Sequence, residues 1–333
     1  MMRMRWEQYT SALRTHHRII IAGGIGTLIL ATGILFSPFL FSSAQNAISE
    51  ATHPVPPAPE PLPPPDAYAG LRLTARAAIV VDLSSGTTLF ERNANVQLPL
   101  ASLTKLLTTY AAANTLAPIV PVTITREALA ADGDSGFFAG ETFAFSDLAR
   151  FALVASSNDA ASAIAEAAAA QRTESTHTLL QAAAVNARLS QTYALNGTGL
   201  DLNEVTAGAY GSARDVAKLA AAFLAKAPTI ARATTEPSVT IQSTIGIPHT
   251  MPNTDIAVTR YPNMLLSKTG FTDLAGGNLA IVFDAGMNHP VAVVVLGSTR
   301  DERFTDMDTL VRATLVHFAE QLSSNTFTIS YDS

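Results

Sequence analysis

The side chains with the clearest capacity for chemistry are Ser102 and Lys105, which begin and end the chain's single Ser-x-x-Lys run. The sequence predicts a helix from Ser102 to about residue 116, with Pro99 just upstream. Because residues i and i+3 share one face of a helix, the Lys105 amine can reach the Ser102 hydroxyl and activate it as a nucleophile. The pair is weak by itself, since roughly one such match arises by chance in a chain of this length, and a serine at a helix start is also a common N-cap.

The second candidate motif is Ser156-Ser157-Asn158, in a predicted break within the alanine-rich helical stretch 146–190. Side chains in such a break can project into a cleft. This motif is also weak alone, because a second Ser-Ser-Asn stands at 323–325 and because Ser156 and Asn158 would serve equally well as helix caps.

The third motif is Lys268-Thr269-Gly270, which occurs once, at a predicted strand start, and is followed by the predicted strands 278–284 and 290–298. Fewer than about one chain in ten of this size would carry it by chance. Taken alone, Lys268 would be an ordinary surface lysine before a turn.

The order of the motifs is more informative, because Ser-x-x-Lys comes first along the chain, Ser-x-Asn second and Lys-Thr-Gly third. This series is the signature of penicillin-interacting serine enzymes.

The motifs must be positioned by the helices and strands around them. The order of these predicted elements indicates one sheet built from both ends of the chain, with helices between. The other predicted elements are hairpin strands 77–82 and 87–91 with the turn 83–86, helices 213–227 and 305–322, and breaks near 156–158 and 171–176 within the helical stretch. The expected fold class is therefore α/β (α+β), with an inserted helical lobe.

Composition excludes several other kinds of chemistry. The 333 residues include no cysteine, which removes disulfides, thiolate nucleophiles and Cys-ligated zinc. The seven histidines are scattered and form no His-x-x-x-His pair, so a zinc peptidase is disfavoured and we expect no metal or other cofactor. Residues 19–333 carry a net charge of −9 without a basic cluster, so we expect no nucleic-acid partner.

The N-terminal segment 1–41 differs in kind from the rest of the chain. Residues 1–18 carry a net charge of +3 and are expected to be a cytoplasmic tip. Residues 19–41 contain no charge and are long enough to cross a bilayer as an uncleaved anchor. The alternative is a signal peptide cut after Ala44, although the apolar run exceeds the usual core of about 7–15 residues. Both interpretations export the remainder of the chain.

A proline-rich linker is expected over residues 42–70. Eight of the chain's 18 prolines lie between Pro54 and Pro65, so this stretch should be an extended spacer. A docking ligand for a partner domain is the alternative. A catalytic domain over residues 71–325 and a short tail over 326–333 complete the expected organisation.

At these motifs the chain resembles the D-alanyl-D-alanine carboxypeptidases of the low-molecular-mass penicillin-binding protein type, serine peptidase family S11. The blocks that carry the resemblance lie at 101–108, 157–161, 196–201, 212–220 and 268–278, within roughly residues 71–320. The resemblance implies the penicillin-binding protein/serine β-lactamase-like fold, with an antiparallel sheet and flanking helices. It also implies a peptidase that trims the terminal D-alanine from peptidoglycan stem peptides.

The resemblance further implies the partners and the reacting groups. The partners would be the D-Ala-D-Ala stem, β-lactams as covalent inhibitors, and the lipid bilayer of a bacterial cell membrane, with the catalytic domain outside the cytoplasm. Ser102 is the expected nucleophile, and Lys105 is its base, kept neutral by burial and by the nearby charge of Lys268. Ser156 would pass the proton to the leaving amine. The backbone N–H groups of Ser102 and Phe271 would form the oxyanion hole.

The remaining motif residues are expected to bind substrate. Asn158 would hold Lys105 and the substrate amide, while Lys268 and Thr269 would bind the terminal carboxylate of the peptide. Gly270 has no side chain, so the substrate backbone could lie against this strand as an added strand.

Three departures from the family pattern leave every reacting group in place. Ser157 replaces the usual glycine, Asn196-Gly197 stands where Asn-Pro is common, and Phe271 follows the Lys-Thr-Gly. Three other functions stay open: a serine β-lactamase, a D,D-endopeptidase and a catalytically idle wall-binding protein. The Glu-x-x-Leu-Asn motif of class A β-lactamases does not occur in the sequence, so we expect slow release of β-lactams.

Overall fold

The computed structural model describes residues 66–286 and 288–328. The predicted cytoplasmic tip, membrane anchor and signal cut, together with most of the linker, lie outside these residues, as do positions 287 and 329–333. No helix within the described ranges is long and apolar enough to span a bilayer.

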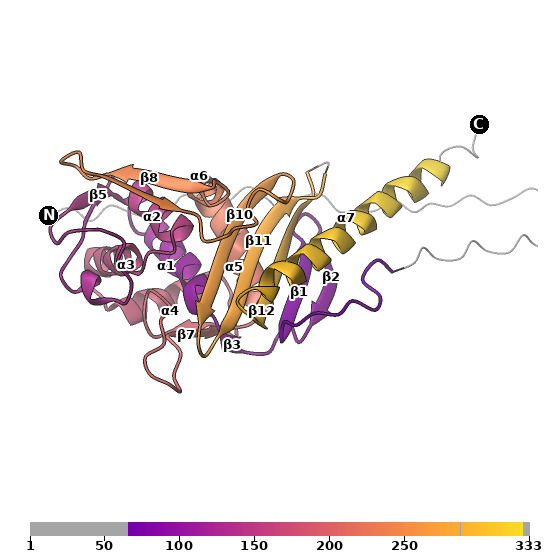
Figure 1. The fold of residues 1–333 in the computed structure, drawn as a ribbon, viewed down its shortest axis with the longest axis horizontal. Helices are drawn as coiled ribbons and strands as arrows, with labels where there is room; N and C mark the ends of the chain where they lie inside the picture. The colour runs from indigo at the N-terminus through magenta and orange to yellow at the C-terminus, as the bar shows by residue number, and fades with distance from the viewer. Residues whose placement is uncertain (1–65, 287, 329–333) are drawn as a thin grey trace, which may run out of the picture. The chain divides into compact units, whose positions relative to one another are not determined.

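A five-stranded antiparallel sheet forms the central layer of the described chain, in the order β10-β11-β12-β1-β2 (Figure 1). Its strands are β1 (Ala77–Asp82), β2 (Thr88–Arg92), β10 (Met264–Thr272), β11 (Gly276–Asp284) and β12 (Pro290–Ser298). β1 pairs with β12, starting from Ala77 opposite Leu296. The prediction of one sheet assembled from both ends of the chain is confirmed.

Alternate residues of β1 face two separate cores, which explains why this strand is buried on both sides. Ala77 and Ile79 pack in the core of the helical lobe, whereas Ala78 and Val80 pack in a second core with α7 (Glu302–Thr328). Successive side chains of a strand point to opposite faces, so a sheet covered on both faces needs apolar residues at every position. Figure 1 shows α7 running along one face of the sheet.

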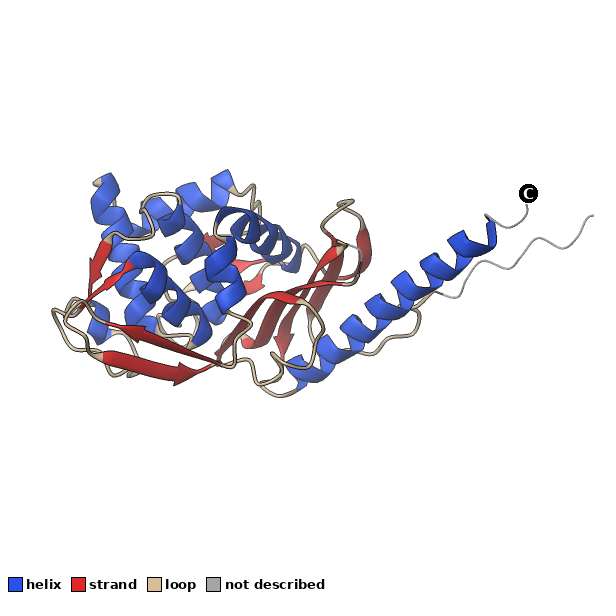
Figure 2. Ribbon diagram, turned by 90° about the horizontal axis from the view of Figure 1, so that it is seen from above, coloured by secondary structure: helices blue, strands red, loops and turns tan. Residues whose placement is uncertain are grey.

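The helical lobe is inserted between β2 and β10, and Figure 2 shows its helices gathered beside the sheet. The lobe contains α1 (Thr104–Ala113), α2 (Phe145–Val154), α3 (Asn158–Arg172), α4 (Thr176–Asn186), α5 (Ala213–Lys226) and α6 (Pro228–Ala233). The predicted helix breaks fall where α2 meets α3 and where α3 meets α4.

Short strands and 3₁₀ turns complete the lobe. The strands are β3 (Leu98–Pro99), β4 (Pro121–Thr123), β5 (Thr142–Ala144), β6 (Tyr193–Ala194), β7 (Ala209–Gly211), β8 (Ser238–Gln242) and β9 (Pro248–Pro252). The 3₁₀ turns are Ala101–Leu103 and Ala128–Ala130. β8 and β9 form a hairpin that packs on α2.

Several element boundaries differ from the sequence expectations. The Lys-Thr-Gly motif lies inside β10 rather than at a strand start ahead of residues 278–284. The full length of this edge strand was not recognised, because its polar residues interrupt the apolar pattern of a strand. The helix predicted from Ser102 begins as a 3₁₀ turn, and α1 ends at Ala113. α7 continues to Thr328 rather than ending at residue 322.

Candidate active site

Ser102 stands on the 3₁₀ turn Ala101–Leu103, which runs directly into α1. Ala101 has a φ of +47°, a left-handed conformation that is costly for a residue with a Cβ. Its neighbours on the turn are buried, whereas Ser102 is half-buried. Lys105 lies on the buried side one turn later, and its Nζ is 2.8 Å from Ser102 Oγ. The predicted hydroxyl–amine pairing is therefore present.

Lys105 Nζ has two further partners, and both are hydrogen-bond acceptors. It donates to Asn158 Oδ1 at 2.6 Å and to the Thr198 carbonyl at 2.9 Å. The side chain is completely buried, and this burial lowers the pKa of Lys105 to about 7. A large fraction of Lys105 is therefore neutral at physiological pH, as a lysine must be before it accepts a proton.

The second motif forms the junction between α2 and α3. Ser156 has a φ of +57°, and the next residue, Ser157, caps α3 by accepting a backbone N–H at 3.1 Å. The capping role considered for Ser156 and Asn158 therefore belongs to Ser157, which gives this serine a structural reason to replace glycine. Asn158 Nδ2 donates to the Asp132 carbonyl at 2.5 Å, which holds Oδ1 of the same amide toward Lys105.

The third motif brings a second lysine to a second serine. Lys268 Nζ donates to Ser156 Oγ at 2.9 Å and to the Thr269 carbonyl at 2.8 Å. Lys268 is buried, and burial first, then the charges of Lys105 and Arg303, lower its pKa well below the ordinary lysine value. The contact with Ser156 was not predicted, because the two residues are far apart in the chain and belong to different motifs.

Gly270 allows β10 to pack against the turn that carries Ser102. A Cβ at this position would lie 3.0 Å from the Leu100 carbonyl oxygen and 3.3 Å from the Leu103 nitrogen. The missing side chain therefore serves the contact between strand and turn, whereas the sequence had suggested only room for substrate. Phe271 is the next residue of β10 after Gly270. The two N–H groups predicted for the oxyanion hole, on Ser102 and Phe271, therefore belong to elements in contact.

The Thr198 carbonyl is held by a loop whose role the motifs did not reveal. Asn196 Oδ1 accepts the backbone N–H groups of Thr198 at 3.2 Å and of Gly199 at 2.7 Å. Gly199 has a φ of +81°, and a Cβ there would overlap the Ala101 carbonyl oxygen. The sequence block 196–201 indicated that this loop is typical of the family, but not that it contacts Lys105.

Two arginines near the start of α7 also reach the third motif. Arg303 donates through Nη1 to the Gly270 carbonyl at 2.8 Å, and Arg300 lies over the Phe271 ring at 4.2 Å from its centroid. Sequence reasoning missed both, because they belong to no motif and come from a separate element.

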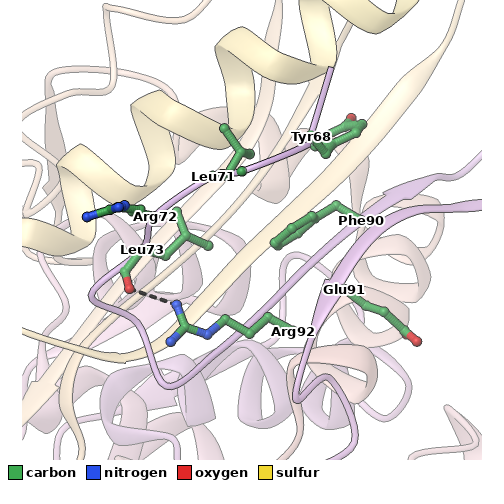
Figure 3. Close-up of a pocket in the computed structure, with 8 residues that line it drawn as sticks. Tyr68, Leu71, Arg72, Leu73, Phe90, Glu91 and Arg92 are labelled. Atoms are coloured by element: carbon green, nitrogen blue, oxygen red, sulfur yellow. Dashed lines mark hydrogen bonds between the residues drawn. The ribbon is translucent and has the colours of Figure 1, made fainter. Parts of the chain in front are cut away.

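A cavity of about 510 Å³ lies elsewhere, between residues 68–73 and the edge strand β2 (Figure 3). Tyr68 and Phe90 stack there at 5.7 Å, and Arg92 donates to the Leu73 carbonyl at 2.7 Å. Its lining residues include no serine and no lysine. The candidate active site is therefore at the other edge of the sheet, beside β10.

This arrangement suits acyl transfer to a serine: a half-buried hydroxyl faces a buried amine of lowered pKa, beside a second Ser-Lys pair and the edge strand of a mixed α/β fold. The family model of the D-alanyl-D-alanine carboxypeptidases, peptidase family S11, matches residues 64–300. The chain belongs to this family and is a serine peptidase, so the expected resemblance and class of enzyme are confirmed.

Individual relatives agree with the family assignment. A Pseudomonas aeruginosa protein named D-alanyl-D-alanine endopeptidase is 28% identical over 273 residues, covering 79% of this chain and 81% of that protein. The Escherichia coli D-alanyl-D-alanine carboxypeptidase DacC is 30% identical over 250 residues, covering 71% of this chain and 60% of that protein.

Solved structures confirm the fold. Penicillin-binding protein D2 from Listeria monocytogenes, in its ampicillin-bound form, matches with a TM-score of 0.62 and 24% identity, over 73% of this chain and 98% of that chain. A D-alanyl-D-alanine carboxypeptidase from Mycobacterium tuberculosis matches with a TM-score of 0.66 and 24% identity, over 74% and 92%. The penicillin-binding protein-like mixed α/β fold is therefore the fold of this chain.

Proposed function

We propose that this chain removes the terminal D-alanine from peptidoglycan stem peptides through an acyl-enzyme on Ser102. The observation that carries the proposal is the set of hydrogen bonds at Lys105. A neutral amine has two N–H groups and one lone pair, and the acceptors on Asn158 and Thr198 take both N–H groups. The lone pair is left for Ser102 Oγ at 2.8 Å, where it can take the hydroxyl proton.

In the proposed first step, Ser102 Oγ attacks the carbonyl between the two D-alanines while Lys105 accepts its proton. The N–H groups of Ser102 and Phe271 stabilise the negative oxygen that develops. Ser156 then gives its proton to the leaving nitrogen, and Lys268, 2.9 Å behind it, replaces that proton. The C–N bond breaks, D-alanine leaves, and water hydrolyses the ester by the reverse sequence.

The substrate is proposed to bind along β10. This strand is the last of the five-stranded sheet, so a peptide can pair with its free edge as an added strand. Lys268 and Thr269 lie on the same strand and would bind the terminal carboxylate. The amide of Asn158 retains one N–H beyond its bond to the Asp132 carbonyl, and this N–H would hold the substrate amide.

β-Lactams should acylate the same serine, because their cyclic amide offers the same kind of carbonyl near a carboxylate. The ampicillin-bound Listeria monocytogenes relative supports this expectation. Since the class A deacylation motif is missing from the sequence, we expect the penicilloyl-enzyme to persist for minutes or longer.

We propose that residues 19–41 anchor the chain in the bacterial cell membrane, with residues 1–18 in the cytoplasm and the catalytic domain outside it. The uncharged run and the +3 charge before it support this orientation. The proline-rich linker would then hold the catalytic domain away from the bilayer.

Labelled penicillin and a pentapeptide stem together test this function. The full-length chain should retain the label on Ser102 and release D-alanine from the stem. The Ser102→Ala variant should do neither while keeping the thermal unfolding curve of the wild type. Rapid turnover of the penicillin, or full D-alanine release by Ser102→Ala, would refute the proposal.

A D,D-endopeptidase is the second candidate, favoured by the name of the Pseudomonas aeruginosa relative. Both activities cleave after a D-alanine by the same acyl-enzyme, so they differ only in the leaving group, which is free D-alanine in one case and a second stem peptide in the other. Giving the enzyme purified cross-linked dimers and free pentapeptides in one mixture, and comparing the two rates by mass spectrometry, separates them.

A further inference from the structure

Thr254 lies at the site and carries a hydroxyl group that the proposed mechanism does not use. It lies in the segment between β9 and β10, and its Oγ1 is 2.7 Å from Oγ1 of Thr269 in the third motif. On its other side, Oγ1 is 3.4 Å from the carbonyl of Val154, the last residue of α2. Thr254 therefore bridges β10 and the end of the helix that precedes the second motif.

The backbone holds Thr254 in place without help from its hydroxyl. Its N–H donates to the Val154 carbonyl at 3.1 Å, and the next residue, Asp255, accepts the Ser267 hydroxyl at 2.5 Å. Removing only the hydroxyl should therefore leave the segment where it is.

Either hydroxyl of the pair Thr254 and Thr269 can donate to the other. With Thr269 donating to Thr254 and Thr254 donating to Val154, both hydrogens are used within the protein, and Thr269 has none for a ligand. If both hydroxyls rotate, Thr254 donates to Thr269 and the Thr269 hydrogen is free to point outward. The Val154 carbonyl keeps the Thr254 N–H in both arrangements, so it is never left without a partner.

We propose that Thr254 is a positioning residue for the terminal carboxylate of the substrate. This inference rests on the proposed function, because the carboxylate is that of the terminal D-alanine. A carboxylate beside Thr269 is a stronger acceptor than a hydroxyl, so its arrival favours the rotated arrangement. Thr254 then donates to Thr269, and Thr269 donates to the carboxylate. The pair thus favours an anionic end of the substrate over a neutral one.

The test pairs one substitution with two substrates that differ only at the C-terminus. The full-length Thr254→Val variant keeps the side-chain shape but loses the hydroxyl. It is assayed with a D-alanyl-D-alanine peptide and with the same peptide as its C-terminal amide. We expect kcat/KM for the acid to fall about tenfold, mainly through KM, because the bond to the carboxylate exists before and during the reaction. For the amide we expect a change of less than about twofold.

Two further variants control the test. Thr254→Ser keeps the hydroxyl and should restore kcat/KM for the acid to within about twofold of wild type. Thr240→Val removes one hydroxyl of another threonine pair, Thr240 and Thr250, whose exposed hydroxyls lie 2.9 Å apart on the β8–β9 hairpin. This variant should leave kcat/KM unchanged for both the acid and the amide.

An equal loss on acid and amide, or no loss on either, would overturn the role of Thr254. Failure of the proposed function looks different, because the wild type itself would then release no D-alanine. The acylation rates with a penicillin and with its methyl ester apply the same comparison without relying on peptide hydrolysis. A Thr254→Val effect confined to the free acid supports the role, and an effect equal on both refutes it.

Discussion

At the scale of single residues, the two buried lysines are the dominant electrostatic feature of the site. Burial disfavours the charged form of each, and the charge of Lys105 further lowers the pKa of Lys268. Both therefore resist being protonated together. An anionic substrate end beside Lys268 favours its charged form, which in turn favours neutral Lys105. Substrate binding should thus help to place the base in its reactive state.

The pKa of Lys105 sets the expected pH dependence of acylation. Only the neutral amine accepts the Ser102 proton, so the rate constant for labelled penicillin should rise about tenfold per unit below pH 7. Because Lys268 must be charged to return a proton to Ser156, and its pKa lies well below the ordinary lysine value, the rate should then level off and fall again at higher pH. Stopped-flow or quench measurements between pH 5.5 and 9.5 provide the profile. An ordinary lysine would instead give a rate that still rises steeply above pH 8.5.

Lys105→Arg is the matching variant, because it keeps the positive charge but cannot deprotonate. We expect acylation by labelled penicillin to fall by roughly 10²–10⁴-fold, the usual contribution of a general base. Acylation at a near wild-type rate would show that a neutral amine is not required.

At the scale of elements, the start of α3 sets the position of Asn158. Ser157 and Ser175 both cap helices by accepting a backbone N–H at 3.1 Å, at the starts of α3 and α4 respectively. Each serine-to-alanine change should cost about 1 kcal/mol of unfolding free energy, measured by urea denaturation. Only Ser157→Ala should also slow acylation, because α3 carries the amide that holds Lys105. Equal acylation rates in the two variants would contradict this link.

The turn that carries Ser102 depends on the space at Gly199. Gly199→Ala places a Cβ against the Ala101 carbonyl and also has to adopt a φ of +81°. Gly246→Ala at the tip of the β8–β9 hairpin has a φ of +87° and meets nothing within 4 Å, so it isolates the backbone cost. We expect Gly246→Ala to cost about 1 kcal/mol and Gly199→Ala at least about 3 kcal/mol, as measured by denaturant unfolding. Similar losses of unfolding free energy in the two variants would mean that the turn carrying Ser102 shifts at little cost to make room for the Cβ.

At the scale of the whole molecule, the N-terminal residues and the catalytic domain should be separable. The family match begins at residue 64, and the described fold begins at residue 66 with two cores of its own. A chain that starts at residue 64 should therefore fold, acylate at a rate within about twofold of the full chain, and stay in the supernatant after ultracentrifugation. The full chain should sediment with membranes. Loss of the label in the short chain would show that the N-terminal residues support the site.

Much of the architecture could be predicted from local patterns. The β-branched run in β1, the turn after Asp82 and the break before Asn158 depend on neighbours in sequence, and the structure has all three. The range of β10 was not predicted, although a strand start was expected at its Lys-Thr-Gly, because its burial comes from packing against other elements, while its own residues include Lys268 and Gly270. An edge strand of that composition has no periodic pattern to recognise.

The sequence by itself determined which side chains are candidates for the reaction, because a serine three residues before a lysine on a helix must share its face, and because the three motifs occur in a characteristic order. Tertiary structure alone decided how those groups are connected. It placed Lys268 against Ser156, the Thr198 carbonyl against Lys105, and Thr254 against Thr269. These contacts join segments whose separation in the chain is set by loops and packing, and the low pKa of Lys105 arises only when the folded chain excludes water from its amine.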